Sequence, residues 1–209
     1  MRKTIIGLEA HDGCGKSTTA SNLVALFGGL QFDTEKHKQS RRPIYKKNIP
    51  KEQMMLEIHQ TYLAEKDDFY LKSTKHNFCV LDRTWLSHAV EENVIDLDKN
   101  DESYPTFRHD LGIPGELIVP DLIFQIILPE EERKKRVSKR DEKLTKRDIK
   151  LAEDEAYREH LDAERKKFGC IPLRLRLRDE KVCALRAAQI VLSSEATPPM
   201  NVNLSGFFD

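Results

Sequence analysis

The sequence lacks any hydrophobic run long enough to cross a membrane. No apolar stretch in its 209 residues approaches the roughly 18 residues that a transmembrane helix needs. The apolar run that follows Lys3 is broken by Glu9, and it is too short for a signal peptide. We therefore expect no membrane partner, and we predict a cytoplasmic protein.

Paired cysteines and an excess of one charge are also missing. The absence of a C-x-x-C pair predicts reduced thiols at the four scattered cysteines, Cys14, Cys79, Cys170 and Cys183. The 35 Lys and Arg residues balance 35 Asp and Glu residues, so the net charge gives no support to a nucleic-acid partner. His59 and His76 show no spacing that is typical of metal ligands.

A phosphate-binding pattern follows the first apolar run. The pattern is close to G-x-x-x-x-G-K-[ST], with Ala10 at the first glycine position. Glycines leave backbone N–H groups open to an anion, Lys16 can reach the β- and γ-phosphates, and the Ser17 hydroxyl can bind Mg²⁺. The alternative is an ordinary glycine turn between a strand and a helix. We predict an ATP-binding loop (the P-loop) formed by Ala10, His11, Asp12, Gly13, Cys14, Gly15, Lys16, Ser17 and Thr18.

Two further carboxylates follow predicted strands. Asp82 ends a short apolar run, where it could hold Mg²⁺ or orient a substrate hydroxyl, and Arg83 offers a fork for a phosphate. A pair that only caps the next helix is the alternative for these two residues. Glu35 follows a weak strand predicted at 30–34, and it is either a ligand-binding carboxylate or a solvated loop residue.

Alternation of strand and helix patterns predicts an α/β fold with a parallel five-stranded sheet covered by helices on both faces. Leu173, Leu175 and Leu177 alternate with arginines, which is typical of a strand at the sheet edge. The predicted domain covers residues 1–192, and 193–209 form a loosely ordered tail. The predicted strands are 3–9, 30–34, 78–81, 122–128 and 171–178, and the predicted helices are 17–27, 51–74, 84–94, 130–140, 151–168 and 180–192.

A basic run extends from Arg133 to Lys150. This run has three possible interpretations: a solvated charged helix, a mobile lid that brings arginines over a transferring phosphoryl group, or a nucleic-acid-binding patch. The run has no interleaved aromatic residues, which argues against the nucleic-acid patch. We place the predicted lid at about residues 136–150.

Three segments in this order resemble the thymidylate kinase family of P-loop nucleoside monophosphate kinases. Glu9–Thr18 is similar to the family's E-G-x-D-G-x-G-K-[ST]-T, and Asp82–Ala89 is similar to D-R-Y-x-x-S-x-x-A-Y. The third segment begins with Pro120-Asp121-Leu122 and continues into a helix that carries R-x-x-x-R. Thr84 departs from the family pattern, because the family usually has Tyr or His at that position.

The resemblance implies a role for each matching residue. The P-loop holds the donor phosphates of ATP, Lys16 neutralises the transferring group, and Ser17 with Asp82 positions Mg²⁺. Asp12 would lie near the acceptor sugar hydroxyl, and Arg83 would hold the acceptor phosphate.

The resemblance also implies where the catalytic arginines lie. Gly13, and not an arginine, follows Asp12. In the family, this arrangement accompanies catalytic arginines in the lid, which indicates Arg136, Arg140 or Arg147. The resemblance also suggests a homodimer.

These observations predict ATP- and Mg²⁺-dependent phosphoryl transfer to a nucleoside monophosphate, either dTMP or a related pyrimidine deoxynucleotide. One alternative is a nucleoside kinase that uses Glu35 as the general base. Another is a P-loop ATPase that acts as a nucleic-acid-binding regulatory module, supported by the basic run. The nucleotide substrate is the expected partner.

Overall fold

Five parallel strands form one sheet at the centre of the molecule. The computed structural model describes residues 2–41, 43–44, 47–87, 90, 117–139, 151, 153–175 and 179–195. The strand order is β2-β3-β1-β4-β5, which confirms the predicted parallel five-stranded α/β sheet. The strands are β1 (Thr4–Ala10), β2 (Leu30–Asp33), β3 (Phe78–Asp82), β4 (Leu122–Ile127) and β5 (Ile171–Arg174).

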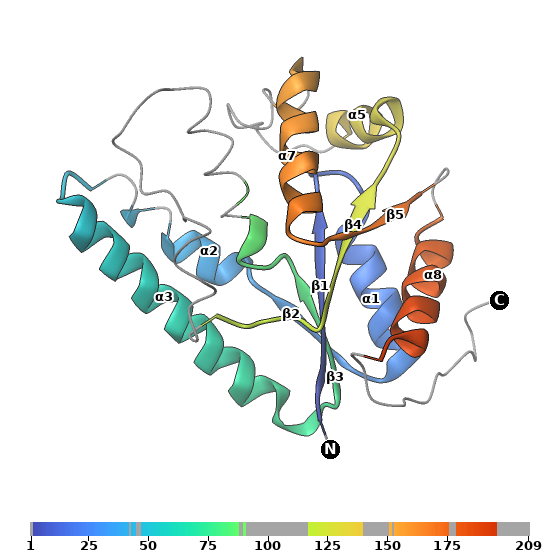
Figure 1. Cartoon of the computed structure of the whole chain (residues 1–209), viewed down its shortest axis with the longest axis horizontal. Helices are drawn as coiled ribbons and strands as arrows, with labels where there is room; N and C mark the ends of the chain where they lie inside the picture. The colour runs from blue at the N-terminus through green and yellow to red at the C-terminus, as the bar shows by residue number, and fades with distance from the viewer. Residues whose placement is uncertain are drawn as a thin grey trace.

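Helices cover both faces of this sheet. Figure 1 shows α1 beside α8 on one side of the sheet and α3 on the other. The helices are α1 (Lys16–Phe27), α2 (Glu35–Arg41), α3 (Lys51–Lys72), α5 (Glu130–Ser138), α7 (Glu155–Lys167) and α8 (Glu180–Ser193), with a 3₁₀ turn, η2 (Ser73–Lys75). Within the described residues, no helix combines the length and apolar character that a membrane span requires.

Alternate residues of β1 supply two hydrophobic cores. Ile6 and Leu8 are fully buried in a cluster that includes Leu23 of α1 and Ala187 of α8. Ile5 belongs to a second cluster that contains Phe69 of α3. Successive side chains of a strand point to opposite faces, so a strand covered on both faces is apolar nearly throughout. The apolar run that predicted β1 therefore reflects its central position.

The alternating strand near the C-terminus lies at the sheet edge, as predicted. Leu173 and Leu175 are buried, whereas Arg174 is exposed. β5 ends at Arg174, and the last part of the predicted strand, 176–178, lies outside the described residues.

Local capping explains where two helices begin and end. Gly28 adopts a left-handed conformation with φ 66° and donates its N–H to the carbonyl of Val24, which ends α1 as predicted. The structure interrupts the predicted helix 151–168: Leu151 and Glu153 are helical, but the helix breaks at Asp154 and α7 begins at Glu155. Asp154 is extended there, and its carboxylate accepts a hydrogen bond of 2.9 Å from the Tyr157 N–H.

Several predictions fall on segments outside the described residues. The predicted helix 84–94 is described only through 84–87 and 90, and the predicted lid only up to 139. The tail predicted from 193 is described only to 195.

Candidate active site

The P-loop lines a pocket at the carboxyl ends of β1, β2 and β3. Parallel strands place their carboxyl ends along one sheet edge, and this edge is where open α/β sheets bind ligands. The pocket has a volume of about 430 Å³. Its lining combines backbone and polar side chains from three segments: His11, Asp12, Gly13, Cys14, Gly15, Lys16, Ser17 and Thr18, then Asp33, then Asp82 and Arg83.

Two loop glycines occupy backbone conformations that other residues rarely adopt. Gly13 has φ 88° and Gly15 has φ 79°, both in the left-handed region. A Cβ on Gly13 would lie 2.8 Å from Val137 Cγ2, and one on Gly15 would lie 2.8 Å from Glu180 Oε1. Ala10 ends β1 and does not need a positive φ, so alanine is tolerated at the first position of the motif.

Lys16 reaches across the pocket to Asp82. Its ammonium forms an ion pair with Asp82 Oδ1, and both side chains are almost entirely buried. Burial is the largest cause of a lowered Lys16 pKa, to about 7, and the Arg83 charge lowers it further against the opposing carboxylates of Glu9, Asp12 and Asp33. The structure therefore brings together two residues predicted to bind phosphate and metal, and it holds them in contact with each other.

Arg83 is directed toward the P-loop. Its guanidinium pairs with the Asp12 carboxylate, and the residue is 8% exposed. Arg83 also has φ 77°, and it is the one non-glycine residue with positive φ among those described. Such a conformation costs energy and is characteristic of functional sites. The predicted substrate residues Asp12, Asp82 and Arg83 thus meet in one place.

Behind the loop, a partly buried polar cluster attaches His11 to α7. Asp162 Oδ1 accepts hydrogen bonds from His11 Nε2 at 2.9 Å, Arg165 Nη1 at 2.9 Å and Gln125 Nε2 at 2.6 Å. Burial lowers the His11 pKa despite the opposing hydrogen bond to Asp162. Burial raises the Asp162 pKa, but the hydrogen bond and charge of His11, with Arg165, outweigh it and lower that pKa. Sequence spacing gave no sign of this cluster.

Arg133 supports the same loop from α5. It is 2% exposed, and its Nη1 donates a 3.2 Å hydrogen bond to the Asp12 carbonyl. Its Nη2 donates to the Leu151 carbonyl at 3.0 Å, and its guanidinium pairs with Glu130. Arg133 was only one cation of a basic run in the sequence, and no local pattern distinguished it from its neighbours.

Arg136 also lies next to the loop. Its Nη1 would be 3.2 Å from a Cβ on Gly15, and it pairs with Glu180 at 2.5 Å. The predicted catalytic roles of Arg140 and Arg147 fall outside the described residues, and the role of Arg136 in catalysis stays a prediction.

Asp33 is a carboxylate that the structure places in the pocket at the end of β2, and the predicted role of Glu35 stays a prediction. Glu35 begins α2, and its side chain is outside the described residues. Asp33 lines the pocket and is the register partner of Asp82 in the neighbouring strand. The rule that identified Asp82, a carboxylate at the carboxyl end of a strand, could have identified Asp33 as well.

The pocket offers oxygen ligands that fit Mg²⁺. Ser17, Asp33 and Asp82 line it together. Mg²⁺ is typically bound by one or two carboxylates together with substrate phosphates and water. The described residues contain no group of three or more His, Cys, Asp or Glu that could hold a metal by itself.

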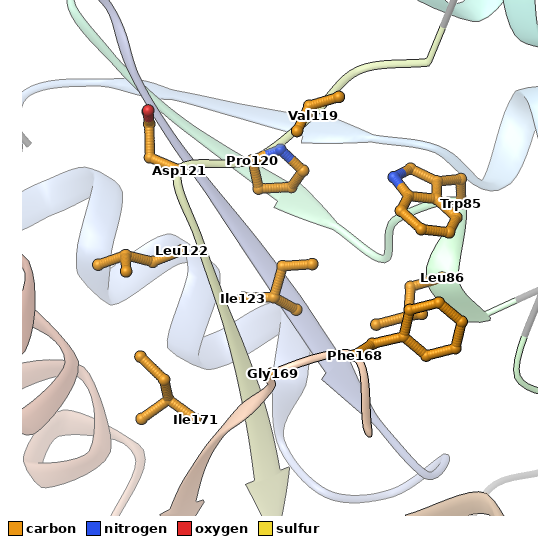
Figure 2. Close-up of a pocket in the computed structure, with 10 residues that line it drawn as sticks. All are labelled: Trp85, Leu86, Val119, Pro120, Asp121, Leu122, Ile123, Phe168, Gly169 and Ile171. Atoms are coloured by element: carbon orange, nitrogen blue, oxygen red, sulfur yellow. The ribbon is translucent and has the colours of Figure 1, made fainter. Parts of the chain in front are cut away.

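A second, mostly apolar pocket lies beyond the turn that carries Arg83. It has a volume of about 240 Å³ and lies between the start of β4 and the end of α7 (Figure 2). Trp85 packs edge-on against Phe168 in its wall, with the ring centroids 5.9 Å apart. This contact anchors the chain just after Arg83 and Thr84.

Comparison with solved structures supports the fold. The chain is similar to a thymidylate kinase from Candida albicans, with a TM-score of 0.61 and 16% identity over 96% of this chain and 98% of that one. A deoxyadenosine kinase from M. mycoides has a TM-score of 0.57 and 18% identity, over 91% and 100% of the two chains. A thymidylate kinase from Ehrlichia chaffeensis has a TM-score of 0.50 and 16% identity, over 91% and 99%.

No protein-family model matches the sequence, and neither does any curated protein. The structural likenesses extend over nearly the whole chain. The chain therefore has the α/β fold of the P-loop kinases.

Proposed function

We propose that this protein transfers the γ-phosphoryl group of ATP, with Mg²⁺, to a nucleoside monophosphate, either dTMP or a related pyrimidine deoxynucleotide. The observation that carries the proposal is the meeting of Lys16, Asp82 and Arg83 in the P-loop pocket. One cation is then available for the donor phosphates and another for the acceptor phosphate. Thymidylate kinases among the structural neighbours support this choice of acceptor.

In this proposal, an acceptor phosphate oxygen attacks the γ-phosphorus in line. A new P–O bond forms as the bond from the γ-phosphorus to the β,γ-bridging oxygen breaks, and ADP leaves. A phosphate monoester is already a nucleophile, so the protein contributes positioning and charge stabilisation. Arg83 would hold the acceptor, and Asp12 would orient both Arg83 and the acceptor sugar.

Donor binding would rearrange the Lys16–Asp82 pair. The β- and γ-phosphates attract Lys16, because they carry more negative charge than one carboxylate. Asp82 is then free to join Ser17 and Asp33 in holding Mg²⁺, which would neutralise phosphate charge when bound.

A nucleoside kinase remains the second candidate, and one observation favours it. Asp33 lines the pocket at the carboxyl end of β2, and a hydroxyl acceptor needs a general base. A deoxyadenosine kinase also has the same fold. Asp33 thereby joins Glu35, the base expected from the sequence, as a candidate general base for this acceptor.

The basic run gives less support to a nucleic-acid-binding module. Its first arginine, Arg133, is engaged with Glu130 and the P-loop backbone, and Arg136 is paired with Glu180. Homodimerisation and a cytoplasmic location stay predictions from the sequence.

The test is a panel of nucleosides and nucleoside monophosphates offered with ATP and Mg²⁺, scored by ADP release and by product identification. We expect a pyrimidine deoxynucleoside monophosphate to give the highest kcat/KM, and Lys16→Ala to abolish transfer while circular dichroism stays unchanged. Preference for a nucleoside would establish the second candidate. Normal turnover by Lys16→Ala would refute both.

A further inference from the structure

Glu9 is a buried carboxylate that the phosphate-binding motif does not explain. Its side chain reaches the turn that follows β3, and the residue is 0% exposed. Its Oε1 accepts hydrogen bonds from the Thr84 N–H at 2.9 Å and from Thr84 Oγ1 at 2.8 Å. Its Oε2 accepts a hydrogen bond from Ser87 Oγ. All three donors therefore come from the segment that immediately follows Arg83.

The close approach of Thr84 to β1 requires glycine at position 7. A Cβ on Gly7 would lie 2.6 Å from Thr84 Cγ2, which is far closer than van der Waals contact. It would also lie 3.1 Å from Pro120 Cγ and 3.3 Å from Ile123 Cγ1, two residues that are seen together in Figure 2. Gly7 makes room for the Thr84 methyl group, and Glu9, two residues along the same face of β1, accepts hydrogen bonds from Thr84.

The turn held in this way is the one that directs Arg83 into the pocket. The Arg83 N–H donates to the Leu8 carbonyl at 3.2 Å, and its φ of 77° then reverses the chain. Thr84 Oγ1 accepts a hydrogen bond from the Leu86 N–H at 3.1 Å, so one threonine connects the turn to the following residues. A strained backbone persists only where its surroundings fix it, and Glu9 and Thr84 provide those contacts.

The energetic cost of Glu9 argues for a role beyond packing. Burying a carboxylate is costly unless it is paired; the three hydrogen-bond donors here are neutral groups, and the charge of Lys16 offsets only part of that cost. An apolar residue would fill the same space without that cost, but it could not hold the Thr84 N–H and hydroxyl.

We propose that Glu9 is a positioning residue for the acceptor site, acting through Thr84 and Ser87 to fix the Arg83 turn. This inference rests on the proposed function, in which Arg83 holds the acceptor. The thymidylate kinase family, which the sequence resembles, usually has Tyr or His at the position of Thr84. The Thr84 hydroxyl that donates to Glu9 is therefore a feature of this chain.

The kinetic test uses variants that leave the P-loop unchanged. Glu9→Asp keeps the charge that favours protonated Lys16 but shortens the side chain, and Thr84→Val removes the hydroxyl while keeping the shape. We expect each to raise the acceptor KM about tenfold, because a hydrogen bond to a charged group is lost, while the KM for ATP stays the same. Thr84→Ser keeps the hydroxyl and should behave like the wild type.

A double-mutant cycle at Gly7 and Thr84 provides a second, independent check of this positioning role. Gly7→Ala should raise the acceptor KM, because its methyl group displaces Thr84. The double variant Gly7→Ala with Thr84→Ser lacks the colliding Cγ2 and should recover part of the loss. Absence of any recovery would contradict the coupling between β1 and the turn.

An activity-independent measurement separates this inference from the proposed function. In NMR spectra, the Thr84 amide proton should shift upfield and exchange faster with solvent in Glu9→Asp than in the wild type. If no acceptor is phosphorylated but the amide responds, the proposed function fails and the positioning of the turn stands. Equal rises in the KM values for ATP and acceptor, or an unchanged Thr84 amide, would overturn the inference.

Discussion

The Lys16 ammonium and the Asp82 carboxylate form an ion pair across the floor of the P-loop pocket. Lys16 belongs to the P-loop and begins α1, and Asp82 ends β3, the strand next to β1. In the free protein the two groups satisfy each other. Phosphate binding therefore has to compete with Asp82 for Lys16, and four predictions arise from this pocket and its supports.

Nucleotide affinity should fall as the pH rises from about 7 to 9. The Lys16 pKa is lowered to about 7, so the free protein loses this proton over that range. Phosphate favours the charged ammonium, so binding takes up a proton and weakens by up to about tenfold per pH unit. Isothermal titration calorimetry with ATP in buffers of different ionisation enthalpy measures both effects. The Lys16→Met variant should bind weakly without this dependence, and a flat wild-type profile would show that Lys16 stays charged throughout.

Substitutions at Asp33 and Glu35 distinguish the two acceptor classes. With a monophosphate acceptor no general base is needed, so we expect Asp33→Asn and Glu35→Gln to keep kcat within about tenfold of the wild type. A nucleoside acceptor would instead make the variant of the general base, either Asp33→Asn or Glu35→Gln, lose about 10²–10⁴-fold in kcat, with the other variant as its matched control. Steady-state kinetics with the best acceptor and saturating ATP decide the outcome.

Removing Asp162 should destabilise the protein through the charge that it leaves behind. Arg165 is 1% exposed and donates to Asp162 at 2.9 Å, so Asp162→Ala leaves a buried guanidinium without this carboxylate. Because the Asp162 side chain is 36% exposed, solvent screens part of this cost, and we expect a loss of about 1–2 kcal/mol in the free energy of unfolding, measured by urea denaturation. Asp162→Ala combined with Arg165→Met should recover much of it, and equal losses in the single and double variants would contradict this explanation.

Gly13→Ala should cost about 1–3 kcal/mol of stability, because the new Cβ would lie 2.8 Å from Val137 Cγ2 in addition to the strain at φ 88°. Gly28→Ala is the matched control. It has φ 66° but nothing within 4 Å of its Cβ, so it should show the backbone strain alone. Thermal melts of both variants, and of Gly13→Ala with Val137→Ala, separate the steric cost from strain. Equal losses in Gly13→Ala and Gly28→Ala would exclude a steric contribution.

Local patterns were sufficient for the architecture and for the donor side of the site. The apolar run of β1 predicted a strand, and the helix predicted at 17–27 ends at Phe27 as α1 does. The glycines and Lys16 of the P-loop predicted an anion-binding turn, because their chemistry depends on the local backbone. The start of α7 was not predicted, because the helical pattern continues through Asp154. In the structure, Asp154 is extended and caps the helix that begins at Glu155.

The sequence by itself determined the strand–helix alternation, the P-loop and the presence of Asp82 and Arg83 at a strand end, since each depends on residues near one another in the chain. Only the tertiary structure decided that Lys16 pairs with Asp82, that Asp33 lines the pocket, that His11 binds Asp162 and that Glu9 holds Thr84. These contacts depend on which strands become neighbours and on how helices pack against them. That choice is set by the burial of the whole core, which no local pattern contains.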